Sequence, residues 1–311
     1  MIFDEDFVKR IQQAIDSRDI EFLKSFVKPV SQREKKKPFF VSALMVPANR
    51  AKFLNKIDEL EVDAVIVNLE DGVAKEEKEA ALYAAMLFLS HIGQKRPYIV
   101  VRVNPIFEGG LREIELLNSV YPDGIRVAKV KGVEDIEDVK TVLDPDIDLH
   151  ISVETKEAFL ELPSFKDMGI AACYLGILDL LADLGISQGV VKISNPTVDY
   201  ILAKFLTEAK AIGALAVSFV YQDFRRLDEF EEWCRYEKEM GFTSKVAISP
   251  DQARIINRIF SIDKNLLQRA LYIKKRFEEM QKRGVTGFSD EKYGFIDEPV
   301  YKDALNILNQ R

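Results

Sequence analysis

Charged and amide side chains recur where short apolar runs of this sequence end. They are Asn68, Glu70 and Asp71 after the second run, Arg102 and Asn104 after the third, Lys129 after the fourth, Glu154 after the fifth and Asp179 after the sixth. Four carboxylates, an arginine and a lysine gathered at one place are difficult to explain by packing alone. Such a set can hold an oxygen-ligated metal ion and stabilise the negative charge of an enolate.

Glu154 and Asp179 are the natural metal pair, because Mg²⁺ is usually held by one or two carboxylates, with water and substrate completing its shell. The chain has only two histidines, His91 and His150, so it cannot build a histidine-rich zinc site. Arg102 offers a planar fork for a substrate carboxylate or an enolate oxygen. Together these residues predict chemistry on a C–C bond next to a carbonyl.

The elements that position these residues follow a regular rhythm. Eight short β-rich runs are separated by segments whose apolar residues recur at helical spacing. The runs span 39–46, 63–70, 98–104, 124–130, 149–154, 171–176, 214–219 and 245–249. This alternation predicts an α/β chain folded as a (β/α)₈ TIM barrel, in which the active site forms at the carboxyl ends of the strands. A doubly wound sheet is the alternative, but no glycine-rich GxGxxG or GxxxxGK[ST] turn supports it.

Helical segments flank the predicted barrel of residues 38–261. Residues 1–37 form an N-terminal helical extension that ends in the charged run 33–37, which we expect to be a solvated linker. Residues 262–311 form a C-terminal helical segment with a helix, a loop and a last helix that starts near Pro299.

Alternation along the strands places certain side chains inside the barrel. His150, Ser152 and Glu154 share one face, so we expect His150 to be a hydrogen-bonded histidine of the barrel interior. Cys173 is expected in the core, and His91 in a polar turn on the surface.

Composition excludes several classes of protein. The chain of 311 residues is 47% hydrophobic and 31% charged, with 44 basic and 51 acidic residues and a net charge of −7. An acidic chain without a large basic block is a poor candidate for binding nucleic acid or anionic lipid. No apolar run reaches the roughly 18 residues of a membrane span. The acidic N-terminus and the two cysteines favour a cytoplasmic protein.

A series of motifs resembles one known family. They are SALMVPANRAKF (42–53), VIVNLEDGVAKEEKEAA (65–81), VVRVNP (100–105), AKVKGVEDI (128–136), VET (153–155), LGILDLLADLG (175–185), GFTSKVAISPDQARIIN (241–257) and GFIDEPVYKDALNIL (294–308). In this order and spacing they resemble the citrate lyase beta-subunit-like family, acyl-CoA lyases of the HpcH/HpaI aldolase and citrate lyase superfamily. The likeness runs from about residue 39 to the C-terminus.

The resemblance implies a barrel lyase that uses Mg²⁺, with Mn²⁺ as an alternative. Its substrate would be a hydroxyacyl thioester, such as the citryl, malyl or citramalyl ester of coenzyme A or of an acyl-carrier protein. By the same resemblance, Glu154 and Asp179 match metal ligands, and Arg102 matches the arginine that grips substrate oxygens. Glu70 and Asp71 match acidic residues at the same mouth.

The resemblance also implies an assembly. Asp297 matches an aspartate that a neighbouring subunit donates to the active site, so we expect a homo-oligomer, a trimer or a multiple of it. Capping the last helix is a second use for Asp297. Pro47, Asn49 and Arg50 match positions near the thioester carrier.

The sequence leaves two other functions open. A class II aldolase acting on 2-keto acids such as pyruvate has a similar fold and metal pair but uses a histidine base near its first strands, and no histidine precedes His91. A barrel without activity that binds a ligand or partner is supported by departures from the family pattern at Ala48, Asn68 and Leu178. The joint presence of the metal pair and the arginine speaks against it.

Overall fold

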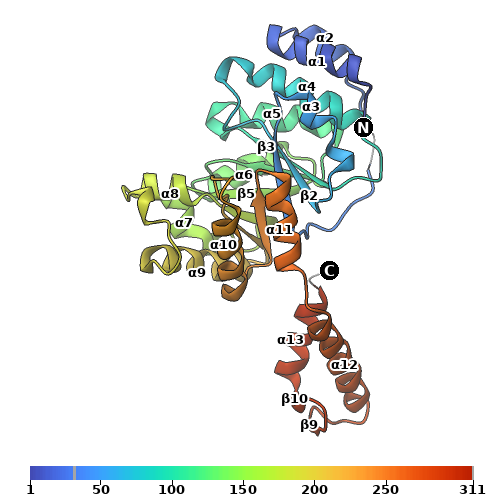
Figure 1. Ribbon diagram of the computed structural model, residues 1–311, viewed down its shortest axis with the longest axis vertical. Helices are drawn as coiled ribbons and strands as arrows, with labels where there is room; N and C mark the ends of the chain where they lie inside the picture. The colour runs from blue at the N-terminus through green and yellow to red at the C-terminus, as the bar shows by residue number, and fades with distance from the viewer. Residues whose placement is uncertain (31–32, 310–311) are drawn as a thin grey trace. The chain divides into compact units, whose positions relative to one another are not determined.

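The computed structural model describes residues 1–30 and 33–309, which form two compact units, residues 1–259 and residues 260–311. Eight parallel strands of the first unit form a closed barrel in chain order, and β8 pairs with β1 (Figure 1). The strands are β1 (Ser42–Pro47), β2 (Ala64–Asn68), β3 (Tyr98–Val103), β4 (Gly124–Val127), β5 (Asp148–Val153), β6 (Ile170–Leu175), β7 (Leu215–Ser218) and β8 (Ser244–Ala247). The predicted (β/α)₈ barrel is therefore confirmed, and each strand lies within two or three residues of its expected run.

Helices of the first unit surround the barrel (Figure 1). They are α1 (Glu5–Ser17), α2 (Ile20–Ser25), α3 (Ala51–Leu54), α4 (Lys78–His91), α5 (Gly110–Leu117), α6 (Val133–Val142), α7 (Lys156–Glu161), α8 (Ile177–Asp183), α9 (Pro196–Ala211), α10 (Leu227–Met240) and α11 (Pro250–Phe260). Local capping defines several of their starts. At α9, for example, the side chain of Asn195 accepts hydrogen bonds from two backbone amides, and Pro196 fits the first helical position.

The N-terminal helices explain why α4 is apolar on all sides. Every residue of α4 from Ala80 to Leu89 is buried, as expected of a helix that has no solvent face. The amphipathic helix α1 buries Ile11, Ala14 and Ile15, and both α1 and α2 pack on α4 (Figure 1). The extension is thus an outer layer over this side of the barrel.

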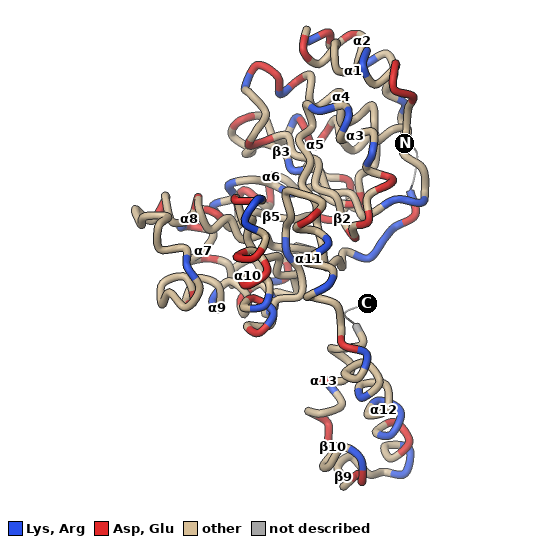
Figure 2. The backbone as a smooth tube through the Cα atoms, in the orientation of Figure 1, with Lys and Arg blue, Asp and Glu red and all other residues tan. Residues whose placement is uncertain are grey.

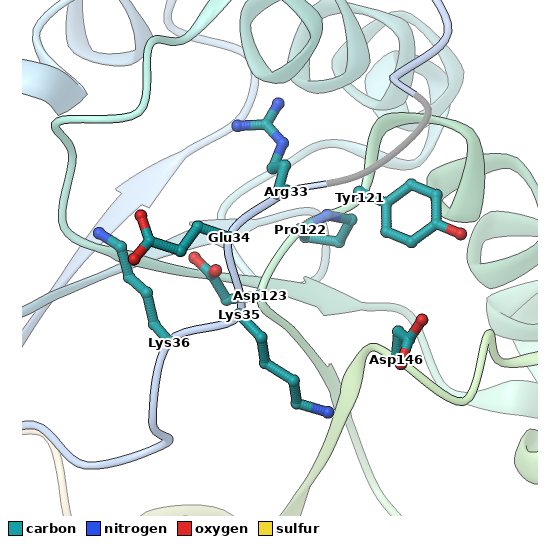
Figure 3. A pocket seen from close by; sticks show the side chains of 8 residues that line it. All are labelled: Arg33, Glu34, Lys35, Lys36, Tyr121, Pro122, Asp123 and Asp146. Atoms are coloured by element: carbon teal, nitrogen blue, oxygen red, sulfur yellow. The ribbon is translucent and has the colours of Figure 1, made fainter.

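The charged run 33–37 is only partly the solvated linker that the sequence predicts. The side chain of Arg33 donates to the carbonyl of Leu89, and that of Lys36 donates to the carbonyl of Arg96, so both are half-buried. With the loop that precedes β4, the run lines a pocket of about 420 Å³ that also includes Tyr121 and Asp123 (Figure 3). This pocket lies at the amino ends of the strands, opposite the end where the sequence predicts the site.

Phe40 follows this run and fills the amino end of the barrel. It is 1% exposed, and its ring stacks with those of His150 and Tyr174. The two nitrogens of His150 lie 3.0 Å from Oη of Tyr174 and 3.2 Å from Oη of Tyr98. His150 is therefore the hydrogen-bonded interior histidine that alternation predicts, and Cys173 is fully buried as expected.

The second unit is a helical hairpin with a small sheet. It contains α12 (Lys264–Gln281), β9 (Gly287–Asp290), β10 (Gly294–Asp297) and α13 (Glu298–Asn309). Its own core includes Phe277, which stacks on Tyr301 with ring centroids 4.4 Å apart. The sequence predicts both helices but only a loop between them. The antiparallel pair β9–β10 corrects that expectation.

Charges of both signs are interspersed along the described chain (Figure 2). Over the same residues, no helix has the length and apolar character that crossing a membrane requires.

Candidate active site

A cavity of about 300 Å³ opens at the carboxyl ends of the barrel strands. Its lining combines carboxylates, two arginines and apolar side chains from most of the strands and their following loops. The lining residues include Met45, Asn68, Asp71, Arg102, Arg126, Glu154, Leu178, Asp179, Phe219 and Ile248. Arg102, Glu154 and Asp179, which the sequence predicts as one site, thus share one cavity.

Arg102 on β3 is the centre of an ion-pair network. It is 4% exposed, and its Nη2 lies 2.8 Å from Oε2 of Glu70 and 3.3 Å from Oε1 of Glu154. Its Nη1 lies 3.4 Å from Oδ2 of Asp71. Burial alone would lower the pKa of Arg102, but these carboxylates raise it. The guanidinium is therefore a fixed positive charge at the cavity wall.

Glu70 and Asp71 follow β2 and have different surroundings. Glu70 accepts from Lys129 Nζ at 3.1 Å and from the amide of Asp71 at 2.7 Å, and it is not among the residues that line the cavity. Burial raises the pKa of Glu70, although Arg102 opposes this effect. Burial also acts to raise the pKa of Asp71, but its hydrogen bond with Glu70 and the cations of Arg102 and Lys129 lower it. Asp71, which lines the cavity, is the more acidic of the two.

Glu154 directly follows β5 and is held from two sides. Its Oε1 accepts from the backbone amide of Lys129 at 2.9 Å, while Arg102 contacts both of its oxygens at 3.3 Å. Lys129 has a φ of 51°, an unusual conformation for a residue with a side chain, which fits a strained backbone position at a functional site. Gly176 packs so closely on Glu154 that a β-carbon there would lie 2.5 Å from Cβ of Glu154.

Asp179 lies on the first turn of α8 and lines the cavity, and it is exposed. Its side chain has no hydrogen bond or ion pair within the described residues. Desolvation raises its pKa, and so do the negative charges of Glu154 and Asp71. A divalent cation would remove this repulsion, and carboxylate oxygens are the ligands that Mg²⁺ prefers. Within residues 1–30 and 33–309, no group of three or more His, Cys, Asp or Glu side chains is arranged to hold a metal ion. An ion held by Glu154 and Asp179 alone would take its other ligands from water and substrate.

The other amide residues of the predicted site hold its loops in place. Asn68 donates to the carbonyl of Asp71 and accepts from the amide of Glu70, so it braces the turn between them. Asn104 lies behind this turn, where its side chain donates to Glu113 Oε1 at 2.6 Å.

The turn after β1 contains the residues expected near the thioester carrier. Asn49 is 5% exposed and donates to Glu77 Oε2 at 2.7 Å, whereas Arg50 is exposed. Gln12 of α1 holds this turn with two hydrogen bonds, to the carbonyl of Asn49 at 3.2 Å and from the amide of Ala51 at 2.9 Å. The lining of the cavity does not include Pro47, Asn49 or Arg50, although these residues lie at the same end of the barrel.

Asp297 belongs to the second unit, at the end of β10. Its Oδ1 accepts from the amide of Val300 at 3.2 Å, which is the helix-capping use that the sequence allows.

Arg126 lines the cavity and was missed in the sequence. It is in register with Arg102 on β3 and with His150 on β5, so it has the same inward parity as both. A charged residue in the middle of the short strand GIRV is the signal that could have identified it.

The fold and this site define a class, the β/α barrels with an acidic, arginine-containing cavity at the carboxyl ends of their strands. Residues 42–250 match the model of the HpcH/HpaI aldolase/citrate lyase family, and the chain belongs to that family.

Curated relatives and a solved structure agree with this family. The chain is 29% identical over 292 residues to a mitochondrial citramalyl-CoA lyase of Mus musculus, covering 86% of this chain and 84% of the relative. It is 28% identical over 247 residues to a (3S)-malyl-CoA thioesterase of Cereibacter sphaeroides, covering 79% and 85%. The fold is similar to the crystal structure of protein CitE from Mycobacterium tuberculosis in complex with magnesium, acetoacetate and coenzyme A. That match has a TM-score of 0.66 and 24% identity, over 88% of this chain and 98% of the other.

Proposed function

We propose that this chain is a carbon–carbon lyase that uses Mg²⁺, or Mn²⁺, to cleave or form a hydroxyacyl thioester of coenzyme A. Citryl-, malyl- and citramalyl-CoA are the candidate substrates. The observation that carries the proposal is the presence of Arg102, Glu154 and Asp179 on one cavity. Its family and the names of its relatives support the same reaction type.

The reaction needs stabilisation of negative charge and movement of one proton. In the cleavage direction the hydroxyl loses its proton, the C–C bond breaks, and its electron pair forms the enolate of the thioester, which is then protonated at carbon. No oxidant or reductant is consumed. Mg²⁺ held by Glu154 and Asp179 would supply positive charge beside the reacting oxygens.

The residues of the chain have separate parts in this scheme. Arg102 donates to the substrate carboxylate or to the enolate oxygen. Asp71 lines the cavity and has a lowered pKa, so it is ionised and can accept the hydroxyl proton. Glu70 is a positioning residue, because its oxygens are engaged by Arg102, Lys129 and the amide of Asp71.

The assembly and the thioester carrier are part of the proposal. A homo-oligomer, a trimer or a multiple of it, would bring Asp297 of the partner subunit to the cavity as a proton donor for the enolate. The turn of Pro47, Asn49 and Arg50 would contact the thioester carrier, and the exposed guanidinium of Arg50 suits a phosphate group. An acyl-carrier protein presents the same phosphopantetheine chemistry and is the alternative carrier.

The competing functions receive less support. An aldolase with a histidine base would need a histidine at the cavity, and neither His91 nor His150 lines it. His150 already uses both ring nitrogens on tyrosines. A barrel without activity gives no reason for an unpartnered Asp179 on the same cavity as Glu154 and Arg102.

The test is to incubate the protein and Mg²⁺ with (3S)-malyl-, citramalyl- and citryl-CoA and to identify the products by mass spectrometry. We expect acetyl-CoA and a 2-oxo acid from at least one thioester. Glu154→Gln should abolish this product, while Glu161→Gln, at an exposed position of α7, should not. Free coenzyme A released without C–C cleavage would contradict lyase activity, and so would a complete lack of products.

A further inference from the structure

Arg126 is a buried cation without an ionic partner. It is 4% exposed, and none of the ion pairs between described residues includes it, although Arg102, Lys129 and Lys245 of the same barrel are all paired. Its Nε donates to Ser152 Oγ at 2.9 Å, but its Nη1 has no hydrogen-bond partner. An unpaired charge is expensive to bury, so a guanidinium in this state indicates an anion that binds there.

The surroundings of Arg126 hold it in place but do not neutralise it. Its guanidinium carbon lies 4.2 Å from the centroid of the Tyr174 ring, which fixes the plane of the fork. Burial, and then the positive charge of Arg102, lower its pKa to about 10, so it remains protonated at neutral pH. Glu154, the acid whose charge acts most on Arg126, is already engaged by Arg102 and by the amide of Lys129.

Arg126 also lies deeper in the barrel than the carboxylates of the site. Its partner Ser152 lies on β5 two residues before Glu154, which follows that strand, and two extended residues span about 7 Å. Because Arg126 lines the same cavity, a ligand held at Glu154 and Asp179 has its inner end directed towards this guanidinium.

The chemistry of the proposed substrate gives this inner end a definite identity. The carbinol carbon of a hydroxyacyl thioester carries the thioester arm, a carboxylate and a third substituent. The thioester arm must leave through the mouth, and the hydroxyl and carboxylate are needed at the metal and Arg102. The third substituent is the one left to extend inwards.

We propose that Arg126 recognises a second carboxylate, on this third substituent, so that the 2-oxo acid half of the substrate is a dicarboxylate. This inference rests on the proposed function for the orientation of the substrate. The anion-binding role of Arg126 rests only on its burial, its unpartnered nitrogen and its place in the cavity.

The experiment compares pairs of 2-oxo acids with the same chain length in the presence of Mg²⁺, by calorimetry. Oxaloacetate is paired with 2-oxobutyrate, and 2-oxoglutarate with 2-oxopentanoate, so that each pair differs only in a terminal carboxylate or methyl group. We expect at least one pair to bind with about a tenfold or greater preference for the carboxylate, as for a hydrogen bond to a charged group. Arg126→Met should reduce that preference to about twofold or less.

Two control variants make the result specific. Arg126→Lys keeps the charge without the fork, so it should retain part of the preference. Arg112→Met removes an exposed arginine and should change nothing. If Arg126→Met does not fold, Arg126→Gln serves in its place.

Equal binding within both pairs by the wild-type protein would overturn the proposal, and so would a preference that survives in Arg126→Met. Chloride that raises the melting temperature of the wild type but not of Arg126→Met, without any preference among the acids, would show an inorganic-anion site instead and also overturn it. Because only binding is measured, a failure of thioester cleavage leaves the result for Arg126 readable on its own.

Discussion

Two neighbouring arginines of the barrel wall have opposite surroundings. Arg102 and Arg126 are partners in the register of β3 and β4, and both are 4% exposed. Carboxylates of three residues surround the first, which raises its pKa, whereas the second lacks an acidic partner, so burial lowers its pKa. The charge of Arg102 is thus balanced by the protein itself, whereas that of Arg126 is left for a ligand to balance.

Gly176 gives a direct test of the position of Glu154. A β-carbon at Gly176 would lie 2.5 Å from Cβ and 2.6 Å from Oε2 of Glu154, so Gly176→Ala must displace that carboxylate. We expect the affinity for Mg²⁺ to fall about tenfold or more, as for other changes behind metal ligands. Calorimetry with Mg²⁺ measures the change.

The matched control is Gly93→Ala, because a β-carbon there meets no atom within 4 Å and its backbone is unstrained. Equal Mg²⁺ affinities of Gly176→Ala and the wild type would show that Glu154 is not a metal ligand.

At the residue scale, strand alternation predicts much of the site. It places Arg102 and Glu154 at the mouth and His150 below them, as found. It does not reveal which charges are paired, because pairing depends on neighbouring strands, and so the isolated state of Arg126 was not predicted. The expectation for His91 is met only in part: its side chain is partly exposed, but it is the last residue of α4 and Phe3 covers part of it, with ring centroids 4.9 Å apart.

At the scale of elements, helix α1 braces a loop of the barrel. Gln12 links α1 to the turn after β1 through the carbonyl of Asn49 and the amide of Ala51. We expect Gln12→Ala to raise KM for the coenzyme A thioester about threefold to tenfold, with little change in kcat, because one or two hydrogen bonds that hold the turn are lost. Steady-state kinetics of thioester cleavage measure both constants.

Gln13→Ala is the control, because Gln13 is exposed on the same helix. A change in kcat alone, or the same effect from both variants, would contradict a bracing role for Gln12.

The elements outside the barrel were harder to predict than the barrel itself. The strands repeat at regular intervals in the sequence. The run 33–37 has the composition of a solvated linker, but its Arg33 and Lys36 side chains donate hydrogen bonds to backbone carbonyls of residues distant in the sequence. The hairpin β9–β10 is short, and its turn depends on Asp290, which accepts from the amides of Lys292 and Tyr293.

The stability of the whole molecule should depend on pH through His150. Burial, and then the charge of Arg126, lower the pKa of His150 to about 3, from an ordinary value of about 6.5. The folded protein keeps this ring neutral, while the unfolded chain binds a proton below pH 6.5. The contribution of the neutral ring to the free energy of unfolding is therefore fully present above pH 6.5. Below that pH it is lost by up to about 1.4 kcal/mol per pH unit, because the unfolded chain binds a proton that the folded protein does not.

Urea unfolding of the wild type and of His150→Gln at several pH values between 5 and 7 gives the free energy of unfolding of each protein as a function of pH. Both proteins contain the same carboxylates, so the difference between the two slopes reports on His150. The free energy of unfolding of the wild type should fall more steeply below pH 6.5. Parallel profiles would show that His150 gains its proton in the folded state.

The proposed exchange of Asp297 between subunits belongs to the same scale. Arg102→Ala and Asp297→Ala chains, each expected to be inactive, are unfolded, mixed in equal amounts and reassembled. If sites are shared, about a quarter of them combine an intact Arg102 with an intact Asp297 of the partner subunit in a closed ring. Activity should return towards that fraction of the wild-type value. A mixture that stays inactive would show that each chain builds its own site.

Phe40 closes the amino end of the barrel, where it stacks on His150 and Tyr174. A closed end makes the cavity a blind passage, so everything that enters through the mouth must leave by the same way. In the proposed reaction the acid half lies innermost, and the thioester half therefore departs first. Kinetics should be sequential and ordered: in the cleavage direction acetyl-CoA is released before the 2-oxo acid, and product-inhibition patterns that indicate random release would contradict this order.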